Sequence, residues 1–131
     1  MDSSSIELPG SEIERITLQD GCLRIHFSRA YIVKTMTGST ERTRWWQAGD
    51  LVMDEAEVEG ELPDGPFVCD GGDVDENIYT YRDMIPIPLD SRGRTRCDLR
   101  LRETDARVAV SARTVRLNMA DVPKYIQHIR D

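Results

Sequence analysis

The chain has 131 residues and a formal net charge of -7, with 39% hydrophobic and 31% charged residues. This length predicts one domain with its own hydrophobic core. No stretch approaches the roughly 18 apolar residues of a membrane span. An acidic chain also lacks the basic field that nucleic-acid binding requires. We therefore expect neither a membrane nor a nucleic acid as a partner.

The N-terminal segment is polar and contains Pro9-Gly10, which predicts a flexible arm over residues 1–11 and a single β domain over residues 12–131. The segment has no basic region followed by an apolar one, so we expect no secretory signal. The three cysteines are widely spaced, at Cys22, Cys69 and Cys97. An odd number of scattered cysteines predicts reduced thiols and a cytoplasmic location.

Alternating apolar and polar residues predict short strands along most of the chain. The step Asp20-Gly21 lies between two alternating runs, which is the strongest local signal of a β-hairpin. Further on, a hairpin is expected over residues 96–119, with a turn at 103–106. Its apolar phase changes between Ala112 and Val115, which predicts a β-bulge near Arg113.

Two segments permit more than one structure. Met84 to Leu89 contains Pro86 and Pro88, which exclude a helix and favour an edge strand or an extended crossing. The tail from Asp121 has apolar residues at helical spacing after Pro123, so it could form a short C-terminal helix or lie extended.

The predicted fold is all-β. About 7–9 mostly antiparallel strands at this spacing are typical of a single-domain β-sandwich or flattened barrel. The alternation of strand and helix that marks a parallel sheet is missing from the sequence.

Acidic residues are concentrated in the middle of the chain, where residues 50–83 hold 12 acidic residues and a single basic one, Arg82. Within this segment Glu55, Glu57, Glu59 and Glu61 alternate with apolar or small residues, which predicts a strand over residues 51–61 with four carboxylates on one face. Trp45 and Trp46 precede it. Adjacent side chains on a strand point to opposite faces, so one tryptophan could anchor a partner beside the carboxylates.

The richest set of oxygen ligands lies in residues 70–77, which we expect to form a turn-rich loop. Its carboxylates are Asp70, Asp73, Asp75 and Glu76. The spacing does not match an EF-hand, because Ile78 falls where that loop needs glycine and Met84 where it needs the bidentate glutamate. An irregular Ca²⁺ site remains open beside the simpler interpretation of an acidic turn, and no other cofactor is indicated.

No catalytic motif occurs in the sequence, so we do not expect an enzyme. The leading hypothesis is a non-catalytic protein-binding module with an acidic face, of the inhibitor or immunity type, whose partner is another protein of basic character. One alternative is a ligand- or cation-binding domain that uses residues 70–77. A second is a homo-oligomeric structural protein that pairs edge strands such as 84–89. The acidic segment could also serve only as a solvated surface.

Overall fold

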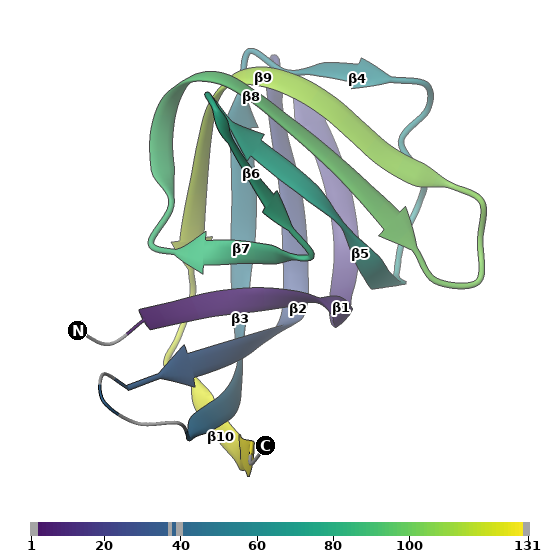
Figure 1. The fold of residues 1–131 in the computed structure, drawn as a ribbon. Coiled ribbons are helices and arrows are strands. Elements are labelled where there is room, and N and C mark those ends of the chain that lie inside the picture. Colours follow the sequence, from purple (N-terminus) through teal and green to yellow (C-terminus); the bar gives the residue numbers. More distant parts are fainter. Residues whose placement is uncertain (1–2, 37, 39–40, 130–131) are drawn as a thin grey trace.

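Residues 3–36, 38 and 41–129 are described by a computed structural model, in which the chain is all-β (Figure 1). The strands are β1 (Ser3–Gln19), β2 (Cys22–Thr35), β3 (Arg42–Asp54), β4 (Glu57–Glu59), β5 (Phe67–Glu76), β6 (Tyr79–Arg82), β7 (Met84–Ile87), β8 (Asp90–Leu101), β9 (Arg107–Met119) and β10 (Lys124–Ile129). Within these residues no helix is long and apolar enough to cross a membrane.

Six of the strands close into a barrel. Antiparallel pairs join β1 to β2, β2 to β3, β3 to β9, β9 to β8, β8 to β5 and β5 back to β1. The all-β prediction is confirmed. The two-layered sandwich, one of the two predicted architectures, is not confirmed. The pairing of β3 with β9 joins the two halves of the sheet into one closed ring.

The remaining four strands extend the barrel. β4 pairs with β9 at one end of the sheet, and β10 pairs with β3 at the other. β6 pairs with β5, and β7 pairs with β1. In Figure 1, β4 lies at the top of the view and β10 at the bottom, with β3 running between them.

The barrel interior is filled by alternate residues of the six closing strands. The fully buried side chains include Phe27, Ile25, Leu51 and Leu99. Because the inward residues are aliphatic or aromatic and the outward residues carry the charges, burial of the apolar face drives closure.

The N-terminal segment is not an arm. β1 begins at Ser3, and Ile6 and Leu8 are completely buried. Residues 1 and 2 lie outside the described part of the chain. The prediction was wrong because polar Ser3 to Ser5 and Pro9-Gly10 give this segment the composition of a loop. It is a strand whose partners lie far away in the sequence. Gly10 has a φ of +92°, and β1 changes register around it, so its two halves pair with β7 and with β5.

The tail is extended, so the helical alternative was wrong. β10 is held against β3 by pairs that include Lys124 with Trp46 and Tyr125 with Trp45. The aromatic contacts across these two strands favour an extended chain over a helix that would turn half of the apolar residues away from β3.

The predicted hairpin turn is confirmed, and the predicted bulge occurs opposite Arg113 but on the neighbouring strand. Asp20 and Gly21 form the two-residue turn between β1 and β2, with φ values of 52° and 78°, as in a type I′ hairpin. The apolar phase of β9 changes after Ala112, and the register between β8 and β9 shifts at the same place. The extra residue of this bulge belongs to β8, where Gly93 and Arg94 lie opposite Arg113.

Candidate functional site

Both tryptophans lie at the end of β3 that projects beyond the barrel, where they form a cluster with β10 and β2. We call this cluster the aromatic end, and its members are Trp45, Trp46, Tyr125, Arg29, Lys34 and Lys124. Trp45 packs edge-on against Tyr125, with ring centroids 5.3 Å apart. The indole N–H of Trp45 donates to the hydroxyl oxygen of Thr43 at 2.8 Å, so its polar atom is satisfied.

Cationic side chains cover the indole rings of the aromatic end. The Lys34 ammonium lies 4.4 Å from the centre of the Trp45 ring. The Trp46 ring has two cations, with the Arg29 guanidinium at 4.4 Å and the Lys124 ammonium at 4.2 Å. Such contacts are worth about 0.5–1 kcal/mol each at exposed sites. The separate sets of neighbours fit the expectation that adjacent tryptophans point to opposite faces of the strand.

The strand that borders the aromatic end has an open edge. Within the described residues β10 pairs only with β3, so its outer backbone groups have no strand partner. Large apolar side chains are exposed beside that edge, namely Val122, Tyr125 and Ile126. An unpaired edge with exposed apolar residues is a template for an additional strand.

The predicted row of four glutamates does not form. β3 ends at Asp54, Glu55 adopts a φ of +50°, and β4 contains only residues 57 to 59. The N–H of Ala56 donates to the carbonyl oxygen of Gly21 at 2.9 Å, which holds the turn against the β1–β2 hairpin. Glu57 and Glu59 alone therefore share a face of β4, and Glu61 lies beyond the turn at Gly60.

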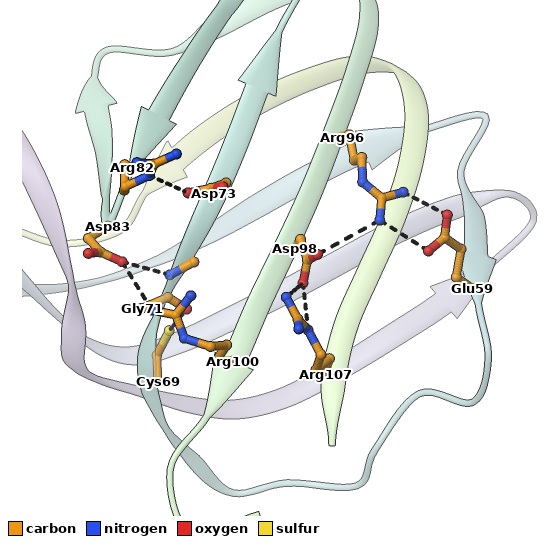
Figure 2. Close-up of polar contacts among 11 residues, drawn as sticks. Glu59, Cys69, Gly71, Asp73, Arg82, Asp83, Arg96, Asp98, Arg100 and Arg107 are labelled. Atoms are coloured by element: carbon orange, nitrogen blue, oxygen red, sulfur yellow. Dashed lines mark hydrogen bonds and ion pairs between the residues drawn. The ribbon is translucent and has the colours of Figure 1, made fainter. Parts of the chain in front are cut away.

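One of these glutamates, Glu59, forms an ion pair with another residue of the same chain. The guanidinium of Arg96 contacts both carboxylate oxygens of Glu59, at 2.6 and 3.1 Å (Figure 2). This pair lowers the pKa of Glu59. Among the described residues, Glu55, Glu57 and Glu61 have no ion pair within 4.0 Å.

The tryptophans and the glutamates lie at opposite ends of β3. Trp46 and Asp54 are separated along one strand by a distance of about 26 Å, at roughly 3.3 Å per residue. The sequence interpretation that placed an aromatic anchor beside the carboxylates is therefore wrong. The tryptophans and the glutamates are close in sequence but far apart in space, because the extended strand β3 lies between them.

An open groove of about 730 Å³ lies on the outside of the barrel, over the bulge between β8 and β9. Its lining includes Glu55, Glu57, Gly93, Arg94, Ser111 and Arg113. We call it the bulge groove. Its lining carries side chains of both charges.

The segment 70–77 is a strand and a tight turn, so the prediction of a loop was wrong. Its carboxylates are held by different partners. Asp73 contacts Arg82 at 3.4 Å and Asp70 contacts Arg102 at 3.6 Å. Glu76 accepts a hydrogen bond from the hydroxyl of Tyr81 at 2.9 Å.

A calcium site needs several oxygens that converge on one point. In the described residues no group of three or more His, Cys, Asp or Glu side chains is placed to hold a metal ion. Asp75 has one buried carboxylate oxygen without a partner, but the other carboxylates of the segment are paired elsewhere. The geometry therefore gives the cation hypothesis no site in residues 70–77.

Sequence reasoning missed the cationic members of the aromatic end and the arginines of the bulge groove. Lys124 is far along the chain from Arg29 and Lys34 of β2, and only the pairing of β2, β3 and β10 brings all three to the tryptophans. Gly93 was a usable signal for the groove, because a glycine inside an alternating strand often marks a bulge.

Comparisons of the chain with protein-family models, with curated proteins and with solved structures found no match.

Proposed function

We propose that this protein is a non-catalytic module that binds another protein through the aromatic end. The observation that carries the proposal is the combination of two tryptophans, each with a cation over its ring, and an adjacent strand with an open edge. Tryptophan, tyrosine and arginine are the residues that most often dominate binding energy at protein interfaces.

The chemistry of the aromatic end favours an acidic partner. Lys34, Lys124 and Arg29 provide positive charge around an apolar surface, and an extended segment could add to β10 as a further strand. Its carboxylates would pair with the lysines while its apolar side chains cover Tyr125 and Ile126. The basic partner that the sequence suggested rested on the acidic residues concentrated in residues 50–83. The break of the glutamate row at Glu55 gives that version less support.

Two further features belong to this proposal. The protein acts without catalysis, because its function requires only a complementary surface. It works in the cytoplasm, where the three free cysteines stay reduced.

A fluorescence titration tests the binding surface. The probe is a six-residue peptide in which glutamate and leucine alternate, and the matched probe has lysine in place of glutamate. We expect the acidic peptide alone to change the tryptophan emission. Lys124→Glu should weaken its binding about tenfold, with a larger loss at low salt because the contact is electrostatic.

The control variant is Arg92→Glu, which makes the same change of charge on β8, away from the aromatic end. It should bind the acidic peptide as the parent does. Equal binding of both peptides, or equal binding by parent and Lys124→Glu, would contradict the proposal.

A further inference from the structure

The bulge groove is built by a local departure from regular pairing. Gly93 has a φ of +125°, and a side chain at this position would collide with the amide oxygen of Asn77. The N–H of Asn77 donates to the carbonyl oxygen of Arg94 at 2.9 Å, which fixes the bulged backbone against the β5–β6 turn. Bulges of this kind occur beside functional sites, and here Arg94, at the bulge, lines the groove.

The groove is lined by side chains of both charges. Glu57 on β4 pairs with Ser111 on β9, and Ser111 pairs with Arg96 on β8. Glu57 and Arg96 are therefore two strands apart, about 10 Å between their Cα atoms. The small side chain of Ser111 lies between them, so no bulky side chain fills the bottom of the groove there.

Charged groups in the groove are not neutralised by one another. The guanidinium of Arg96 is already bound to Glu59, as Figure 2 shows. Within the described residues no ion pair shorter than 4.0 Å involves Arg94 or Arg113, and none involves Glu55 or Glu57. Two carboxylates and two of the three guanidiniums that line this groove of about 730 Å³ therefore have no ion pair.

We propose that the bulge groove binds a small zwitterion, a molecule that carries an ammonium group and a carboxylate group several carbons apart. The carboxylate pairs with Arg94 and Arg113, and the ammonium group pairs with Glu55 and Glu57. The volume of the groove falls in the range of small-molecule sites, about 300–1,000 Å³. This site is separate from the aromatic end and does not depend on the function proposed for it.

Ligands with one sign of charge fit the groove less well. A dicarboxylate would place one of its groups against Glu55 and Glu57, and a diamine would place one against the arginines. Like charges at short range are repelled, so the groove selects for a molecule with both signs. The separation between a carboxylate and a guanidinium of the groove sets the preferred chain length.

Thermal denaturation with a series of ω-amino acids tests the proposal. The probes have three to six carbons between ammonium and carboxylate, and the matched controls are the dicarboxylates and diamines of the same length. At ten times its dissociation constant, a bound ω-amino acid should raise the melting temperature by about 5 °C. We expect an ω-amino acid of one chain length to give the largest rise in melting temperature, and the dicarboxylates and diamines to give none.

Four variants locate the site. Glu57→Gln and Arg113→Gln should each abolish the shift, whereas Glu61→Gln and Arg92→Gln should keep it, since neither of these residues lines the groove. All four residues are outside the buried core, so the variants should fold. NMR spectra of the parent should show changes at the amides of Gly93, Arg94 and Ser111 as the ligand is added.

Three results would overturn the proposal. The first is a shift of equal size with the dicarboxylate, retained in Glu57→Gln, which would make the groove a simple anion site. The second is a shift that survives in Arg113→Gln or NMR changes that lie elsewhere. The third is the absence of any shift with all of the ω-amino acids.

Discussion

Asp83 and Gly72 are joined by a reciprocal pair of hydrogen bonds. The N–H of Gly72 donates to the Asp83 carboxylate at 2.9 Å, and the N–H of Asp83 donates to the carbonyl oxygen of Gly72 at 2.7 Å. Arg100 approaches the same carboxylate at 3.5 Å, as Figure 2 shows. The carbonyl oxygen of Asp83 accepts from the N–H of Leu8 at 2.9 Å. This one residue therefore connects the corner before β7 with β5, β8 and β1.

Replacement of Asp83 tests the importance of this connection. Asp83→Ala removes the acceptor and places alanine at a φ of 59°, so we expect a loss of about 2–3 kcal/mol in the free energy of unfolding. Asp83→Asn keeps an acceptor oxygen and tolerates the left-handed conformation, and should lose less than half as much. Urea denaturation followed by tryptophan fluorescence measures both values. Equal losses in the two variants would show that the hydrogen bonds to the side chain contribute little.

Gly72 is expected to accept no side chain. It has a φ of +150°, and a Cβ atom there would collide with the carbonyl oxygen of Asp98 and lie 2.8 Å from the Cα of Leu99. Gly72→Ala should therefore cost more than about 3 kcal/mol, because backbone of β8 must move. The control is Gly60→Ala, where φ is +76° and the space is open. It should cost about 1–2 kcal/mol, the strain of the left-handed conformation alone. A smaller loss for Gly72→Ala than for Gly60→Ala would refute the expectation.

Acid should weaken the protein in part through Asp50. Burial acts to raise the pKa of Asp50, but its hydrogen bonds with His26 and Arg24 outweigh burial and hold the pKa below its usual value. The two contacts measure 2.6 and 2.7 Å. A carboxyl whose pKa is lower in the folded state stabilises that state above its unfolded pKa, about 3.9, and the stabilisation is lost as the pH falls through the folded pKa.

Comparison with Asp50→Asn isolates this contribution. The variant should be less stable than the parent at pH 5, and the difference should narrow as the pH falls toward 2. Urea denaturation across this range measures it. In Glu55→Gln, which removes an exposed carboxyl without an ion pair, the difference from the parent should stay nearly constant. A constant difference for Asp50→Asn as well would contradict the pKa direction.

The three cysteines should differ in reactivity. Burial raises the pKa of Cys69 to about 11 and raises that of Cys97 further, so at pH 8 the thiolate form of Cys69 is about one part in a thousand. Cys22 is half-buried. With a disulfide reagent such as DTNB, we expect slow reaction of one thiol in the native protein and of three in urea. Cys22→Ser should abolish the reaction of the native protein. Rapid labelling of that variant would contradict the burial of Cys69 and Cys97.

The sequence by itself determined the strands whose patterns are local. The hairpin turn at Asp20-Gly21, the alternation after it and the phase change between Ala112 and Val115 all depend on neighbours within a few residues. Apolar residues that repeat at every second position indicate which side chains of a strand face inward. A turn of two residues can adopt only a few conformations. These features made the all-β prediction correct.

Tertiary structure alone decided where strands end and what meets in space. Glu55 to Glu61 has the alternation of a strand, yet the chain turns at Glu55 to follow β9, whose paired residues lie 50 or more positions away. The partners of Ser4 to Glu7 in β7 are about as distant as any in the chain. Closure of the barrel, the meeting of Lys124 with Trp46 and the charges around the bulge groove all arise from such long-range pairing. No local pattern encodes that pairing, because many registers bury the same apolar face and only the complete barrel selects one of them.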